Sequence, residues 1–306
     1  MFVIPDDFVR KASTFHGEEG IAWIDRLPTI LANCEQRWKL TFDPPFAYQS
    51  YAFHYIAPAV RGDGTAVVVK VHAPTEEFTQ EAEALRLFDG CGMVHLLDYD
   101  MNDKALLLEH LEPGTPLSEL EDDDEATSQA AAVMRQLWRS VAPCHPFPSV
   151  IDWGRGFLRL RQRYEGGNGP FPAALLEEAE TLYAELSASM TEQVLLHGDL
   201  HHKNILAARR APWLAIDPKG VMGEPAYETG ALLRNRLPDL RDASQAVRVL
   251  TRRVDLLAEL LDLDRARIRN WAMTQAVLSA WWTIEDKGSI SADDLTCAEL
   301  LAAIEW

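Results

Sequence analysis

The chain has 306 residues, and 47% of them are apolar, so it is long enough for two domains or one large domain with a substantial core. Its formal net charge of −18 argues against nucleic acid as a partner, because phosphate binding needs clustered Lys and Arg. An acidic surface would attract a cationic small molecule, although such a charge also serves solubility alone.

Neither targeting nor membrane signals are evident. No apolar run is long enough to span a bilayer, and residues 1–14 lack the basic and apolar regions of a signal peptide. The four cysteines are far apart and form no CxxC pair, which argues against a disulfide framework or a structural zinc site. We therefore expect a cytoplasmic protein with no membrane partner, either a monomer or a homodimer.

The N-terminal part of the chain predicts a sheet with two helices. Its apolar periodicity and turn residues mark the segments. A first helix is expected at 18–38, with a break or kink near Pro28. A second helix is expected at 75–92, with a threonine cap and a glycine stop. The strands are expected at 48–60 and 66–73, joined by a Gly62-Asp63-Gly64 hairpin turn, and at 94–100 and 105–111, joined by a turn at 101–104.

From residue 112 the pattern becomes mainly helical. A connection rich in Pro, Gly and acids comes first, and its run 119–126 is interpreted as a solvated loop and helix N-terminus. A helix is expected at 173–189. An apolar stripe with helical spacing, interpreted as core, consists of Val133, Met134, Leu137, Trp138 and Val141. The prediction is an α+β protein with domains 1–111 and 112–306.

The stretch LLHGDLHHKNIL, residues 195–206, predicts a polar loop between two short buried strands. Asp199 and Asn204 have the D-x-x-x-x-N spacing of a kinase catalytic loop, in which the Asp accepts a hydroxyl proton and the Asn holds Mg²⁺. Asp217 follows an apolar strand and would supply a second oxygen ligand to the same metal.

Lys70 lies in the strand pattern AVVVKV, where it faces either water or the core. Glu81 shares a helix face with Leu85 and Phe88, which favours a strand-lysine and helix-glutamate pair of the kind that places nucleotide phosphates. Glu83 is the alternative partner for Lys70.

The spacing of His197 and His201 also permits a metal site. Gly198 argues against a regular helix through both, and no third ligand is evident. We interpret His197 as a hydrogen-bonded anchor of the loop, with zinc binding as the alternative.

With these residues assembled, the chain resembles the aminoglycoside phosphotransferases, in particular the streptomycin 6-kinase and hydroxyurea phosphotransferase group. The motifs are HGDLHHKNIL, AIDPKGVMGEPAYETGALLRN, ALLLEHLEPGTPL and AVLSAWWTIEDKG, and the resemblance extends over nearly the whole chain. It implies a protein-kinase-like bilobal fold, with a small β-rich N-terminal lobe that binds nucleotide and a larger, mainly helical C-terminal lobe.

The resemblance also implies individual roles. Asp199 would be the catalytic base, Asn204 and Asp217 would bind Mg²⁺, and Lys70, paired with Glu81, would contact the α- and β-phosphates of ATP. The hinge that meets adenine through backbone groups would be Glu109, His110 and Leu111. The residues expected near the acceptor are Glu224, Trp281, Glu285, Asp286 and Trp153. As alternatives, Trp281 and Trp282 belong partly to the core, and Glu285 and Asp286 solvate a helix end.

The sequence departs from protein kinases at three places. Gly198 stands where His-Arg-Asp has its arginine, so regulation through a phosphorylated loop is not indicated. Pro218 after Asp217 predicts a metal site without an in/out flip. The nucleotide loop at 46–58 contains no glycine, which leaves the preference between ATP and GTP open.

Three functions follow. The first is an ATP- and Mg²⁺-dependent O-phosphotransferase for a cationic, streptomycin-like aminoglycoside, conferring antibiotic resistance. The second is the same enzyme with hydroxyurea or an unknown metabolite as acceptor; loss of activity on charge reversal at 224, 285 and 286 would favour the first. The third is a nucleotide-binding scaffold without catalysis, against which the intact Asp199, Asn204, Asp217 and Lys70 argue.

Overall fold

The computed structural model describes residues 2–46, 53–235, 242–290 and 292–305. These form two compact units, Met1–Gly114 and Thr115–Trp306, each described here by itself. The glycine-free nucleotide loop expected at 46–58 lies partly outside the described residues, at 47–52. No helix within the described ranges is long and apolar enough to cross a membrane.

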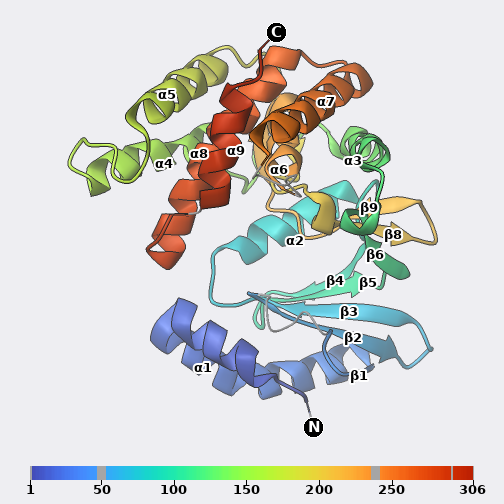
Figure 1. Cartoon of the computed structure of the whole chain (residues 1–306). Helices are drawn as coiled ribbons and strands as arrows, with labels where there is room; N and C mark the ends of the chain where they lie inside the picture. The colour runs from blue at the N-terminus through green and yellow to red at the C-terminus, as the bar shows by residue number, and fades with distance from the viewer. Residues whose placement is uncertain (1, 47–52, 236–241, 291, 306) are drawn as a thin grey trace. The chain divides into compact units, whose positions relative to one another are not determined.

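The first unit consists of a five-stranded antiparallel sheet and two helices (Figure 1). The sheet order is β1-β2-β3-β5-β4. The elements are α1 (Asp6–Trp38), β1 (Leu40–Phe42), β2 (Tyr55–Arg61), β3 (Ala66–Val71), α2 (Glu77–Phe88), β4 (Leu96–Asp100) and β5 (Ala105–Glu109). β2 and β3 pair with Tyr55 opposite Val71, which confirms the hairpin predicted around Gly62-Asp63-Gly64.

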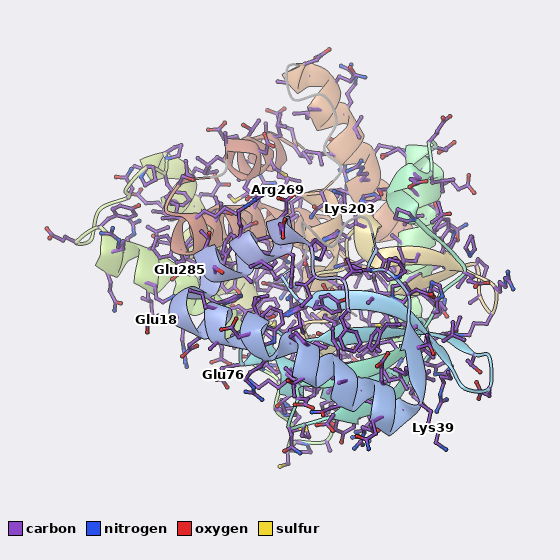
Figure 2. All side chains as sticks on the ribbon, turned by 90° about the horizontal axis from the view of Figure 1, so that it is seen from below. Glu18, Lys39, Glu76, Lys203, Arg269 and Glu285 are labelled. Carbon is purple, nitrogen blue, oxygen red and sulfur yellow. The ribbon has the colours of Figure 1, made fainter. Side chains whose placement is uncertain are left out.

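Helix α1 differs from its prediction in extent and in the place of its break. Its backbone leaves helical geometry at Gly17, where φ is 54°, and not at Pro28, which lies inside the helix. Glycine tolerates that φ without the steric penalty of a side chain, so the break falls there. Glu18, at the start of the predicted helix, and Lys39, the residue after its end, are labelled in Figure 2. The threonine cap expected for α2 is also wrong, because Glu76 occupies that position with no side-chain cap bond.

The two faces of the sheet in this unit bury different side chains. Val67, Val69 and Val71 of β3 pack with α1 in an apolar cluster that includes Leu27 and Leu31. Because side chains alternate along a strand, Lys70 lies on the opposite face. Lys70 bonds there to Glu81 of α2, so the β3 pattern places a lysine between the sheet and a helix.

The second unit is mainly helical, and β6 (Pro113–Pro116) contains the division between the units. Its further elements are η2 (Leu117–Glu119), α3 (Asp123–Leu137), α4 (Val150–Arg163), α5 (Ala173–Ala188), β7 (Val194–Leu196), η3 (His202–Asn204), β8 (Ile205–Ala208), β9 (Trp213–Ala215), β10 (Val221–Gly223), α6 (Pro225–Leu233), α7 (Ala243–Leu261), α8 (Arg265–Lys287) and α9 (Ala292–Ala302).

Helix α8 is the centre of this unit, with α5, α6 and α9 packed against it (Figure 1). Its residues from Trp271 to Leu278 are all buried. The predicted stripe on α3 is confirmed for Val133, Met134 and Leu137. The prediction is wrong for Trp138 and Val141, because the helix ends at Leu137. Asp122 caps α3 by accepting the Glu125 N–H at 3.0 Å, as expected for an acidic helix start.

Candidate active site

In the first unit, Lys70 and Glu81 form a buried ion pair. Lys70 Nζ lies 2.7 Å from Oε1 and 2.6 Å from Oε2 of Glu81, and both residues are less than 5% exposed. The surface alternative for Lys70 is therefore wrong. Glu83 pairs instead with Arg86, whose hydrogen bonds lower the pKa of that carboxyl. A buried pair of this kind fixes the ammonium in one place, because an uncompensated charge would be costly there.

Two histidines that the sequence analysis missed surround this pair. His72 Nε2 lies 2.9 Å from Glu81 Oε2, and the His54 ring packs 4.3 Å from the His72 ring. His54 Nδ1 accepts the Ala73 N–H at 3.1 Å. The signal was present for His72, since it follows Lys70 by two residues in the strand predicted at 66–73 and would share its face, although the observed β3 ends at Val71.

The predicted hinge lies at the end of β5. The Glu109 N–H donates to the His95 carbonyl at 3.0 Å, and Glu109 Oε2 accepts the His95 N–H at 3.1 Å. The His110 ring lies 6.1 Å from that of Phe46, and Leu111 is buried. These bonds fix the strand end and commit the Glu109 N–H within the unit. Contact of this segment with adenine stays a prediction.

In the second unit, the loop of the opening motif runs between β7 and η3, and His197 anchors it. His197 Nε2 donates to the Ile216 carbonyl at 2.8 Å, and Nδ1 accepts the Asp199 N–H at 3.3 Å. Burial lowers the pKa of His197 to about 4, so the ring is neutral near pH 7. Because both ring nitrogens are committed, the anchor interpretation is confirmed and the zinc alternative is wrong.

Glu228 of α6 holds the backbone of the same loop. Its Oε2 accepts the His197 N–H at 2.6 Å, and its Oε1 accepts the Gly198 N–H at 2.9 Å. Glu228 is 1% exposed, and this burial raises its pKa to about 7. The sequence analysis missed this residue. A signal was present, because Glu228 is an acid at the centre of the apolar segment PAYETGALL, and a buried carboxylate needs hydrogen-bond donors.

Gly198 is required by its backbone and by its neighbours. Its φ is +86°, and a Cβ there would lie 2.9 Å from Trp153 Cη2 and 3.0 Å from Val221 Cγ1. A larger residue, such as the arginine of protein kinases, has no room. The Trp153 ring therefore lies against the loop, and it also packs edge-on against Trp282 at 5.9 Å.

The two predicted metal ligands are brought together by the pairing of β8 with β9. The Ile216 N–H donates to the Asn204 carbonyl at 2.9 Å, which places Asp217 beside the end of the loop. Asn204 Nδ2 donates to the Asp199 carbonyl at 3.0 Å, so the amide nitrogen is committed and the amide oxygen remains as a possible ligand. An amide oxygen and a carboxylate are hard oxygen ligands of the kind that suits Mg²⁺.

Among the acceptor-site predictions, two acids pair with arginines of their own unit. Glu224 accepts from Arg267 Nε at 2.7 Å and also from the Trp271 indole N–H. Glu285 of α8, labelled in Figure 2, pairs with Arg159 of α4 at 2.7 Å. These bonds give both acids a part in helix packing, and their contact with an acceptor stays a prediction.

The remaining acceptor-site residues differ in burial. Trp281 is 3% exposed and packs against Tyr164, with its indole N–H unpartnered among the described atoms. Asp286 is exposed near the end of α8. Trp153 lies against the loop at Gly198, as described above. The core alternative for Trp281 therefore agrees with its burial.

Asp199 is half-buried, and an arginine that the sequence analysis missed contacts it. Arg234, at the end of α6, places Nη2 3.1 Å from Asp199 Oδ1. On the other oxygen, His201 Nε2 lies 3.8 Å from Oδ2, and burial lowers the pKa of His201. No sequence signal pointed to Arg234, because a basic residue at a helix end is common.

Comparison with known proteins assigns the chain to a family. Residues 41–287 match the model described as aminoglycoside/hydroxyurea antibiotic resistance kinase. The chain is 35% identical to streptomycin 6-kinase of Streptomyces griseus, over 98% of this chain and 97% of that protein. It is 33% identical to hydroxyurea phosphotransferase of Kitasatospora aureofaciens, over 97% of this chain and 85% of that protein.

Solved structures share the fold at low sequence identity. Choline kinase LicA from Streptococcus pneumoniae aligns with a TM-score of 0.63 at 13% identity, over 92% of this chain and 100% of that one. A thermostable mutant of aminoglycoside phosphotransferase APH(4)-Ia, in complex with ADP and hygromycin B, aligns with a TM-score of 0.60 at 16% identity, over 89% and 97%. The predicted protein-kinase-like α+β fold is confirmed.

Proposed function

Because the chain belongs to the aminoglycoside/hydroxyurea antibiotic resistance kinase family, we propose that it transfers the γ-phosphoryl group of ATP to a hydroxyl of a streptomycin-like aminoglycoside. The observation that carries this proposal is the hydrogen bonding around Asp199. Asn204 Nδ2 donates to the Asp199 carbonyl, and the N–H of Ile216, the residue before Asp217, donates to the Asn204 carbonyl. The nearly full-length similarity to streptomycin 6-kinase supports the choice of acceptor.

Asp199 orients the acceptor hydroxyl and takes its proton. The hydroxyl oxygen forms a bond to the γ-phosphorus, the bond from that phosphorus to the β-phosphate oxygen breaks, and ADP leaves. Lys70, fixed by Glu81, contacts the α- and β-phosphates. Asn204 and Asp217 would hold Mg²⁺, which would supply neutralisation of the charge on the phosphates.

The acidic composition supports a cationic acceptor. With a net charge of −18, the chain attracts a polycation at long range, and this attraction weakens with salt. Hydroxyurea is the second candidate acceptor, favoured by the similarity to hydroxyurea phosphotransferase at 33% identity. A small neutral acceptor gains little from that charge, so its KM would depend weakly on ionic strength.

The test is turnover of Mg²⁺·ATP with streptomycin, hydroxyurea and a panel of other aminoglycosides, with mass spectrometry of the product. We expect phosphorylated streptomycin, and a kcat lower by about 10²- to 10⁴-fold in Asp199→Asn, since that is what a general base contributes. Asp25→Asn, on the exposed face of α1, is the matched control and keeps full activity. Turnover of hydroxyurea alone would replace the acceptor, and equal activity of Asp199→Asn would refute the mechanism.

A further inference from the structure

Arg234 makes a one-sided contact with the proposed base. Its Nη2 reaches Asp199 Oδ1 at 3.1 Å, and its side chain is 15% exposed against 28% for Asp199. Arginine and carboxylate often pair through two parallel bonds, which would occupy both carboxylate oxygens. Here a single oxygen is engaged, so the pair orients the carboxylate and leaves Oδ2 toward His201 at 3.8 Å.

The guanidinium is itself held by the helices behind it. Arg234 Nη1 donates to Ser279 Oγ of α8 at 3.2 Å, and Ser279 Oγ donates to Asp294 Oδ2 of α9 at 3.2 Å. The Arg234 N–H donates to the Gly230 carbonyl at 3.1 Å, which continues the hydrogen bonding of α6. Because these bonds fix the side chain before any substrate binds, the rotamer entropy of a long arginine is not lost again during catalysis.

A purely stabilising role explains this arrangement poorly. Partly exposed ion pairs contribute little to folding, and Asp199 retains more than a quarter of its side-chain exposure. The backbone of the loop is fixed independently by Glu228 and His197. What remains unfixed by those bonds is the rotation of the Asp199 carboxylate about its side-chain torsions, and the Arg234 contact restricts that rotation.

We propose that Arg234 is a positioning residue for phosphoryl transfer. It holds Oδ1 of Asp199 so that Oδ2 faces the incoming acceptor hydroxyl. This inference rests on the proposed function, in which Asp199 accepts the hydroxyl proton. Arg234 acts through Asp199 and needs no contact with the acceptor or the nucleotide.

The test compares Arg234→Met and Arg234→Lys with wild type in the streptomycin assay. Arg234→Met should lower kcat by about 10²-fold, the loss expected when a reacting group is misplaced by an ångström, with the KM for ATP changed less than twofold. Arg234→Lys should recover part of kcat, because an ammonium retains the charge and a donor. Arg252→Met removes a more exposed arginine–aspartate pair, with Asp124 at 2.9 Å, and should keep kcat unchanged.

Two outcomes overturn the inference. One is a kcat of Arg234→Met within twofold of wild type. The other is a loss matched by a fall in folded protein, with no recovery in Arg234→Lys, since that indicates a structural role alone. If wild type phosphorylates none of the acceptors, the proposed function fails, and crystal structures decide about Arg234: the Asp199 carboxylate should rotate in Arg234→Met, and an unchanged rotamer refutes the inference.

Discussion

In the Glu228→Gln variant, one of two buried N–H groups of the catalytic loop would lose its acceptor. The carboxyl group accepts from His197 at 2.6 Å and from Gly198 at 2.9 Å, and both of its oxygens keep accepting lone pairs even when it is protonated, whereas a glutamine presents one accepting oxygen and an NH₂ group that only donates. A buried donor without a partner costs about 1–3 kcal/mol. We expect the free energy of unfolding to fall by about that amount at pH 5, and kcat to fall with it because the loop shifts.

The pH dependence of this difference follows from the pKa of Glu228, which burial raises to about 7 from the ordinary value of 4.5. A carboxyl with a raised pKa stabilises the folded state fully below pH 4.5, and this contribution is lost as pH rises through 7. The shift corresponds to about 3 kcal/mol. Since glutamine does not titrate, the stability gap between wild type and variant should narrow from pH 5 to pH 8.

Urea unfolding followed by circular dichroism measures this gap at pH 5, 6, 7 and 8. Glu192→Gln, an exposed glutamate before β7, is the matched control and should track wild type throughout. A Glu228→Gln curve that coincides with wild type at pH 5 would show that the loop does not depend on this carboxyl group. A gap that is constant from pH 5 to pH 8 would refute the reasoning about its titration.

Three further predictions concern other parts of the two units. Lys70→Met should cost about 3–5 kcal/mol in calorimetry by stranding the charge of Glu81, and a Lys70→Met/Glu81→Leu double variant should regain stability but not ATP affinity. Gly198→Ala should cost about 1–3 kcal/mol in urea unfolding and lower kcat, more than Gly166→Ala, whose φ of +87° is similar but whose Cβ would meet no atom within 4 Å. His197 has its pKa lowered to about 4, so its stabilising contribution, present above pH 6.5, should be lost as pH falls through 4, by about 3 kcal/mol relative to His197→Asn in the same urea assay.

Predictions from the sequence were most accurate where several local signals coincide. The apolar pairs around HGDLHHKN place the loop between two strands, and the D-x-x-x-x-N spacing predicts phosphoryl-transfer chemistry for it without knowledge of the fold. Alternation in AVVVKV assigns Lys70 to one face of a strand, but which face meets a helix is a tertiary property. Only the glutamate on α2 resolved that choice.

Long-range contacts were beyond such reasoning. Along the sequence, Glu228 lies about 30 residues from the N–H groups that donate to it, and Arg234 lies 35 residues from Asp199. No periodicity records such a partnership, because each depends on how α6 packs against the loop. The prediction of the break in α1 failed for a different reason. Pro28 disfavours a helix more strongly than Gly17 does, yet the helix continues through Pro28 and leaves helical geometry at Gly17.

Helix α6 carries both Glu228, which holds the loop backbone, and Arg234, which holds the Asp199 carboxylate. The length of this helix is therefore constrained as tightly as its composition. Deleting one residue between the two positions would turn the guanidinium by about 100° around the helix axis and draw it back by about 1.5 Å. We therefore expect related enzymes that retain both contacts to accept substitutions within this segment but neither insertions nor deletions.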